Sequence, residues 1–202
     1  MNVFLFRHGA VQAKQGKIFL GRTDLPLSAA GRDQAEGWKA YFAESLPGRI
    51  AASPLCRASE FARIIAADRA KEVMIYPALS EIDLGEWDGR PMAEVRANDP
   101  ASWQARGADF AGFRPPGGES FTDLQQRVIP AFEALTAEDD TDLLLVAHAG
   151  VNRVILCHLL GIPLANLFRI VQHPGSLNRI EKKNDHWRID AMNIRSCHEQ
   201  SL

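Results

Sequence analysis

Two short, wholly apolar runs, Val3 to Phe6 and Leu143 to Val146, are bounded by polar residues. Continuous apolar runs of this length are typical of strands that are buried on both faces of a parallel sheet. Ile50 to Ala52 and Val73 to Ile75 are weaker candidates of the same kind. A fold built on these runs therefore has a parallel sheet at its centre.

Helical stretches separate these runs, and each has a recognisable start. The predicted starts are Ser28, Ser53 with Pro54 at the first helical position, Ser120 with Asp123, and His148, whose helix is stopped by Gly161. Leu177 to Ile180 and Trp187 to Ile189 flank a polar turn and predict a closing hairpin. The alternation predicts an α/β fold, a three-layer α/β/α sandwich with a mostly parallel central sheet and an antiparallel edge strand.

The chain shows no internal repeat and no linker, so its 202 residues predict one domain, 1–202. The 23 basic and 25 acidic residues give a net charge of −2, which leaves no basic field for nucleic acid. The apolar run at the N-terminus is too short for a signal peptide or a membrane span. Three widely spaced cysteines suit reduced thiols. We therefore expect a cytoplasmic protein with no nucleic-acid or membrane partner.

Two histidines follow the two strongest strand candidates at the same distance. His8 lies two residues after Phe6, and His148 lies two residues after Val146. Ligands of open α/β sheets bind outside the carboxyl ends of the strands, so neighbouring strands would bring both imidazoles to one pocket. Arg57, one turn into the helix predicted from Ser53, would reach the same edge, where a helix N-terminus favours an anion.

A phosphate site is the chemistry that these residues suggest. Arg7 and Arg57 would flank the histidines as a clamp for phosphate oxygens. Glu81 lies in a loop after the Val73 run, with apolar neighbours that would exclude water, and is the candidate proton donor. Taken alone, each of these residues also suits an ordinary structural or surface role.

The sequence resembles the histidine phosphatase superfamily, in the branch that includes cofactor-dependent phosphoglycerate mutases. Phe6-Arg7-His8-Gly9 resembles the signature of that family. Five further segments follow in the family's order: Phe19 to Gly31, Ala52 to Ala58, Glu81 to Gly89, Pro116 to Ser120, and Val146 to Arg153. Among the phosphatases of the branch, the length and the Gly-Gly-Glu-Ser segment are most similar to the α-ribazole-phosphatase-like group.

The resemblance implies a role for each matching residue. His8 would be the nucleophile that becomes phosphorylated, and Glu81 would be the general acid and base. Arg7, Arg57 and a protonated His148 would bind the transferred phosphoryl group, with Gly21 and Ala149 as further substrate-binding positions. The resemblance implies a phosphomonoester hydrolase that acts on a small phosphorylated metabolite, with α-ribazole 5'-phosphate as a candidate substrate. No metal or other cofactor is implied, and a homodimer is compatible with it.

The main alternative within the family is phosphoryl transfer of the phosphoglycerate mutase type. Mutases carry a longer insertion before the long helix, with an adjacent arginine pair, whereas this chain predicts a lid-like helical insertion at about 90–118. Its arginines are well separated, which favours a phosphatase; they are Arg90, Arg96, Arg106 and Arg114. Three aromatic side chains of the insertion could line a substrate pocket, although packing within a lid is favoured; they are Trp103, Phe110 and Phe113.

Two readings lie outside the family. A metal-dependent hydrolase would use His8, Asp83, His148 and His173, but these histidines have no paired metal-binding spacing. A non-catalytic binding domain on the same fold is the other alternative, because a fold does not fix a function. The full set of histidines, arginines and glutamate argues for catalysis.

Overall fold

A mixed sheet forms the centre of the computed structural model, which describes residues 1–12, 16–67, 72–137, 139–184 and 186–195. Within these residues the sheet has six strands in the order β3-β2-β4-β1-β5-β6. The two strongest apolar runs form β1 (Asn2–Arg7) and β4 (Leu143–Ala147), which pair in parallel at its middle. The two strands that precede His8 and His148 are therefore neighbours, as expected.

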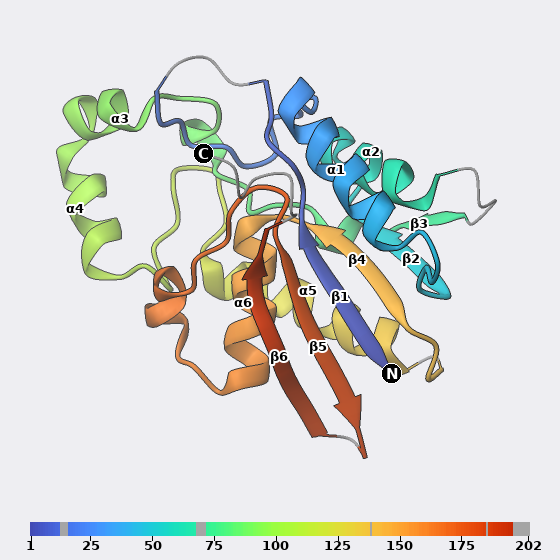
Figure 1. Cartoon of the computed structure of the whole chain (residues 1–202). Helices are drawn as coiled ribbons and strands as arrows, with labels where there is room; N and C mark the ends of the chain where they lie inside the picture. The colour runs from blue at the N-terminus through green and yellow to red at the C-terminus, as the bar shows by residue number, and fades with distance from the viewer. Residues whose placement is uncertain (13–15, 68–71, 138, 185, 196–202) are drawn as a thin grey trace.

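The remaining strands extend the sheet on both sides (Figure 1). On one side, β2 (Arg49–Ala52) pairs in parallel with β4, and β3 (Val73–Ile75) pairs in parallel with β2. On the other side, β5 (Leu177–Lys183) is antiparallel to β1, and β6 (His186–Ile194) is antiparallel to β5. The predicted closing hairpin thus forms the antiparallel edge of a mostly parallel sheet. This edge has two strands, β5 and β6, where one was expected.

Helices cover both faces of the sheet and give the expected three layers (Figure 1). The α-helices are α1 (Ala29–Tyr41), α2 (Cys56–Ala66), α3 (Met92–Asn98), α4 (Pro100–Ala108), α5 (Phe121–Ala137) and α6 (Ala149–Leu160). Three short 3-10 helices are η1 (Pro77–Leu79), η2 (Gly85–Trp87) and η3 (Leu164–Arg169). Among the described residues, no helix is long and apolar enough to cross a membrane.

Side chains of the central strands alternate between two apolar cores. Leu143 and Leu145 of β4 pack with α5 and α6, through residues such as Phe132 and Val154. Leu144 and Val146 belong to the core under α1 and α2. Because successive strand residues point to opposite faces, an unbroken apolar run is what a strand between two helical layers requires.

Three of the predicted helix starts are correct in detail. The Ser28 hydroxyl accepts a hydrogen bond from the Gly31 amide at the start of α1. Ser120 and Asp123 hydrogen-bond each other's backbone amides at the start of α5, as in a capping box. Helix α6 begins immediately after His148 and ends at Gly161, whose left-handed backbone (φ 64°) suits glycine.

The predicted start at Ser53 and Pro54 is wrong by two residues. Helix α2 begins at Cys56, and its N-cap, Leu55, has no side-chain hydrogen bond to the helix. The Ser53 hydroxyl instead lies 2.7 Å from Nε2 of His148, a partner 95 residues away. The hydroxyl also accepts from the Leu55 amide at 3.3 Å, so it combines a local bond before the helix with a tertiary contact.

The insertion predicted at about 90–118 contains α3 and α4, which lie to the left of the sheet in Figure 1. Trp103 and Phe113 pack against Phe19 and Trp87 in a small apolar cluster of their own. The expectation that these aromatic side chains pack is therefore correct for both. Phe110 instead contacts Phe168 of η3, with ring centroids 5.0 Å apart.

Candidate active site

His8 is held at the carboxyl end of β1 by two neighbouring residues. Its backbone amide donates to the Ala147 carbonyl, which fixes the residue beside the end of β4. Its Nδ1 lies 2.8 Å from the Gly9 carbonyl, an acceptor only, so Nδ1 carries the proton and Nε2 keeps a lone pair. Burial, together with Arg7 and Arg57, holds the pKa of His8 well below its ordinary value of 6.5. The ring is therefore neutral near pH 7.

Arg57 approaches that lone pair directly. Its Nε lies 3.2 Å from Nε2 of His8 and donates to it. The other guanidinium nitrogens donate to the carbonyls of Thr23 (2.8 Å) and Gly21 (2.6 Å). Arg57 is fully buried, and Asp24 lies 3.9 Å from its NH1. The loop at 21–24 thus fixes a buried cation beside the unprotonated nitrogen of His8.

A polar network behind the pocket holds Arg7. Its NH1 donates to the Gln172 carbonyl at 2.6 Å, and the Gln172 side chain bonds both Asn152 and Asn178. Its buried Nε has no hydrogen-bond partner in the described structure. Burial lowers the pKa of Arg7 to about 10, so the guanidinium stays charged at neutral pH. A buried cation with an unused donor is suited to an anionic ligand.

His148 faces His8, with the two ring centroids 5.1 Å apart. Burial, reinforced by His8 and the nearby arginines, holds the pKa of His148 well below 6.5. The ring is therefore neutral in the unliganded pocket, and a protonated His148 on a bound phosphoryl group stays a prediction. Nε2 contacts the Ser53 hydroxyl, whereas Nδ1 is buried without a partner in the described structure. If the hydroxyl donates to Nε2, the neutral ring presents an Nδ1–H to a ligand.

Glu81 lies against the first turn of α6. One carboxyl oxygen accepts from the Gly150 amide and the other from the Ile82 amide, both at 3.0 Å. The residue is 6% exposed and lines the same pocket as His8. A Cβ at position 150 would lie 2.4 Å from Oε1 of Glu81, so this approach requires glycine. Leu79 is buried beside it, as expected for a water-excluding neighbour.

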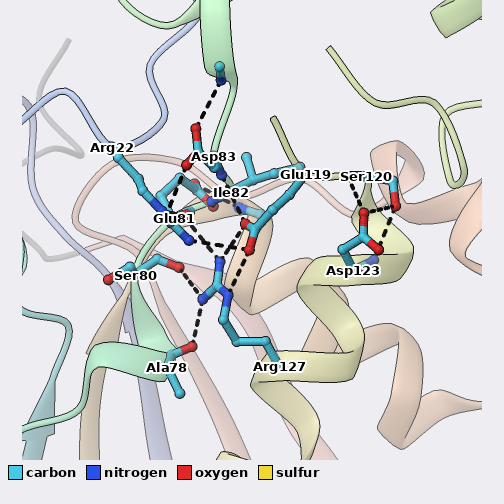
Figure 2. A network of polar contacts seen from close by, with 12 residues as sticks. Arg22, Ala78, Ser80, Glu81, Ile82, Asp83, Glu119, Ser120, Asp123 and Arg127 are labelled. Carbon is cyan, nitrogen blue, oxygen red and sulfur yellow. Dashed lines mark hydrogen bonds and ion pairs between the residues drawn. The ribbon is translucent and has the colours of Figure 1, made fainter. Parts of the chain in front are cut away.

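The backbone that carries Glu81 is clamped by two charged side chains. Figure 2 shows Arg127 of α5 donating to the carbonyls of Ala78 (2.8 Å) and Ser80 (3.0 Å) and pairing with Glu119. Glu119 also accepts from the Asp83 amide at 3.0 Å, on the far side of Glu81. Both flanks of the proton-carrier candidate are therefore fixed to α5 and its preceding loop.

A pocket of about 220 Å³ opens over these groups. Its lining includes Arg7, His8, Arg57, Glu81, Ala149 and Gly150. His148 lies behind His8, and Gly21 contributes its carbonyl to Arg57 rather than lining the pocket. The N-terminus of α6 also lies at this pocket, where the helix dipole favours an anion. Ala149 is the first residue of that helix.

Three polar residues are among those of the site that were not predicted from the sequence. Ser53 was expected to cap a helix, because its contact with His148 depends on tertiary structure. Arg153 lines the pocket from α6, and its spacing of four residues from Ala149 was an available signal for a shared helix face. Gln172 acts through its backbone carbonyl, which leaves no trace in the side-chain pattern.

The residues of the metal-dependent alternative do not come together as a metal site. Within the described residues, no three His, Cys, Asp or Glu side chains are grouped so that they could hold an ion. Asp83 instead pairs with Arg22 at 3.1 Å and accepts from the Gly85 amide.

Comparison with known proteins finds several phosphatases that are similar to this chain. An adenosylcobalamin/alpha-ribazole phosphatase of Escherichia coli K12 is 27% identical over 197 residues, which is 97% of each chain. A glucosyl-3-phosphoglycerate phosphatase of Mycolicibacterium vanbaalenii is 32% identical over 173 residues, covering 80% of this chain and 75% of the relative. The crystal structure of the alpha-ribazole phosphatase from Shigella flexneri superposes with a TM-score of 0.90 at 27% identity, covering 97% of this chain and 98% of that one.

The family model for branch 1 of the histidine phosphatase superfamily matches residues 3–195. This match spans all the segments that carry the candidate site, from β1 through the second histidine to the closing hairpin. The chain therefore belongs to the histidine phosphatase superfamily, branch 1.

Proposed function

We propose that this chain hydrolyses phosphomonoesters through a phosphohistidine formed on Nε2 of His8. The observation that carries the proposal is the state of that ring: Nδ1 is tied to the Gly9 carbonyl, and Nε2 keeps its lone pair beside Arg57. A neutral imidazole with an unprotonated Nε2 is a competent nucleophile once the phosphoryl group takes the N–H of Arg57 from it. The low pKa of His8 keeps it in this form at neutral pH.

In the first step, the Nε2 lone pair attacks phosphorus and the bond to the ester oxygen breaks. Arg7, Arg57 and the Nδ1–H of His148 hold the three remaining phosphoryl oxygens and stabilise their charge. Glu81, protonated for this step, gives its proton to the leaving alcohol. Its buried position in the same pocket as His8 supports that role.

In the second step, a water molecule attacks the phosphohistidine. Glu81, now a carboxylate, takes a proton from this water as its oxygen bonds to phosphorus. The N–P bond breaks, the electron pair returns to Nε2 of His8, and inorganic phosphate leaves. Glu81 is again protonated at the end, so each catalytic group returns to its starting state.

The substrate is a small phosphorylated metabolite. The pocket of about 220 Å³ and the phosphatases similar to this chain support that class. We propose α-ribazole 5'-phosphate as the first compound to test, because relatives matched over 97% of this chain are named adenosylcobalamin/alpha-ribazole phosphatases. A cytoplasmic location, a homodimer and a lid role for α3 and α4 remain predictions from the sequence.

Phosphate release from p-nitrophenyl phosphate and from a panel of phosphomonoesters tests the proposal. We expect His8→Ala to abolish turnover and the matched control His173→Ala, at an exposed position, to leave it unchanged. Turnover should survive EDTA, because arginines already neutralise the phosphoryl charge. Loss of activity with EDTA that Mg²⁺ or Zn²⁺ restores would refute the mechanism, as would full activity of His8→Ala.

A further inference from the structure

Two residues of one loop hold Arg57, and both are themselves held by a single side chain. The carbonyls of Gly21 and Thr23 accept from the guanidinium of Arg57 at 2.6 and 2.8 Å. The amides of the same two residues donate to the two carboxyl oxygens of Asp88, at 2.8 and 2.7 Å. Each of the two residues therefore joins Asp88 through its amide to Arg57 through its carbonyl.

A carboxylate is well suited to this position. An ionised carboxyl group only accepts hydrogen bonds, and its two oxygens match two neighbouring N–H donors. Its charge also acts on the arginine beyond the loop. Burial lowers the pKa of Arg57, and Asp88 is among the nearby groups that counter this effect. Asp88 thus favours the charged form of the arginine as well as its place.

The loop at 21–24 lies against the acid loop, residues 81–89, which contains Asp88. A Cβ on Gly21 would lie 2.5 Å from the Ile82 carbonyl oxygen, so this contact requires glycine. The loop at 21–24 therefore has no room to move toward the acid loop. The two bonds of Asp88 prevent it from moving away.

Arg22 also attaches this loop, but through its own side chain. It pairs with Asp83 and Glu119, and all three side chains are partly exposed (Figure 2). Exposed ion pairs contribute little to stability. These pairs act on Arg22 itself, whereas Asp88 bonds the residues on either side of it.

We propose that Asp88 is a positioning residue for Arg57, on which it acts through the amides of the loop at 21–24. This inference rests on the proposed function, in which Arg57 binds a phosphoryl oxygen beside Nε2 of His8. The acid loop then determines two parts of the reaction. Glu81 near one end carries the proton, and Asp88 near the other end fixes the arginine that binds the phosphoryl group.

Asp88→Asn tests the proposal because it keeps the size of the side chain and breaks the pair of bonds. The amide oxygen of asparagine can accept one bond, but its NH₂ group then faces the other backbone N–H. Displacement of a binding group by about 1 Å costs roughly 100-fold in rate. We expect kcat/KM for p-nitrophenyl phosphate to fall by about 10- to 100-fold, and the inhibition constant of vanadate to rise by a similar factor.

The loss should be the same for aryl and alkyl phosphates. Arg57 binds the phosphoryl group, which both classes of substrate share, whereas Glu81 serves the leaving alcohol. A loss confined to alkyl phosphates, such as glycerol 3-phosphate, would show that Asp88→Asn acts through Glu81 and would overturn the proposal.

Asp142→Asn is the matched control. Asp142 is also half-buried and also accepts from a distant backbone amide, that of Asn2 at 2.6 Å, but at the amino end of β1. Its loss removes a structural bond far from the pocket, so kcat/KM and vanadate inhibition should not change. If Asp88→Asn gives this same result, Asp88 has only a structural role and the proposal is wrong.

A double-mutant cycle with Arg57→Met tests the route of the effect. If Asp88 acts through Arg57, Asp88→Asn should change kcat/KM by about twofold or less once residue 57 is methionine. A loss in that background as large as the loss in the wild type would refute the proposed route.

The position of Arg57 can also be measured without turnover. Its Nε–H donates to Nε2 of His8, so the ¹⁵N chemical shift of Nε2 in a histidine-labelled chain reports this bond. Asp88→Asn should shift that signal, and Asp142→Asn should not. If no phosphomonoester is turned over, or if Arg57→Met does not fold, this comparison decides alone: a shifted signal supports the positioning role and an unchanged one overturns it. Turnover that depends on His8 but not on Asp88 leaves the proposed function intact and removes only this inference.

Discussion

Arg127→Met should displace Glu81 without touching the pocket. The guanidinium donates to the carbonyls of Ala78 and Ser80 and pairs with Glu119 through two nitrogens, at 3.0 and 2.7 Å (Figure 2). Methionine keeps most of the side-chain length and removes all these bonds. The backbone on the N-terminal side of Glu81 then loses its attachment to α5.

The expected loss of stability follows from the number and exposure of these bonds. Hydrogen bonds that involve a charged group contribute about 1.5–3 kcal/mol each, and breaking one side of a buried ion pair costs about 3–5 kcal/mol. Arg127 and Glu119 are each 21% exposed, so water replaces part of what is lost. We therefore expect a loss of about 2–4 kcal/mol, which lowers Tm by roughly 5–15 °C in a chain of this size.

The expected kinetic effect separates proton transfer from phosphoryl transfer. General acid catalysis contributes roughly 10²- to 10⁴-fold, so a misplaced Glu81 should slow alkyl phosphates by about 10- to 100-fold. p-Nitrophenyl phosphate has a good leaving group and should lose much less. Stopped assays on both substrates, with thermal unfolding followed by circular dichroism, measure both effects.

Arg32→Met is the matched control. It breaks the Arg32–Glu60 ion pair between α1 and α2, which has a bond of 2.7 Å but side chains 43% and 32% exposed. Exposed pairs contribute about 0–1 kcal/mol, so Tm and both activities should change little. Arg127 does not hold Glu81 in place if Arg127→Met melts like the control, or if it slows phosphoryl transfer to His8 from alkyl and aryl phosphates equally.

Three further predictions concern the reacting groups. Glu81→Gln should slow the first step, transfer of the phosphoryl group to His8, by about 10²- to 10⁴-fold for alkyl phosphates and by less for aryl phosphates; equal losses in single-turnover release of the two alcohols would move the proton to another residue. Ser53→Ala should lower kcat about tenfold by releasing Nε2 of His148, with recovery in Ser53→Thr; an unchanged kcat would remove this positioning role. The pKa values of His8 and His148 are depressed in the fold, so the unfolded chain binds more protons below about pH 6.5 and Tm should fall from pH 7 to 5. His148→Asn should reduce the dependence of Tm on pH in this range. An unchanged dependence in the variant would contradict the depressed pKa of His148.

The layers of the fold could be predicted because local sequence patterns determine them. The run Leu143 to Val146 specifies a strand between two apolar layers, and Ser28 and Ser120 mark helix starts through bonds made within three residues. His8 and His148 could be placed together for a related reason, since both follow such strands. Parallel neighbours then bring their carboxyl ends to one edge.

Properties that depend on burial and distant contacts could not be predicted in the same way. The neutral state of His148 results from complete burial near Arg7 and Arg57, which no local pattern encodes. Ser53 has a good local role as a cap and a different tertiary one. The clamp on Glu81 joins residues such as Ala78 and Arg127, which are 49 positions apart.

The most direct test of the central claim is to identify the phosphorylated residue. Glu81→Gln lacks the base for the second step but still allows His8 to attack aryl phosphates. The phosphorylated intermediate should therefore accumulate when this variant is incubated with p-nitrophenyl phosphate labelled in its phosphoryl group and the reaction is then quenched. A phosphohistidine mechanism predicts one label per chain, located on His8. The label should be stable in base, lost in acid, and absent from the double variant that also carries His8→Ala. A label that survives acid, or that maps to another residue, would contradict it, as would continued turnover without any label.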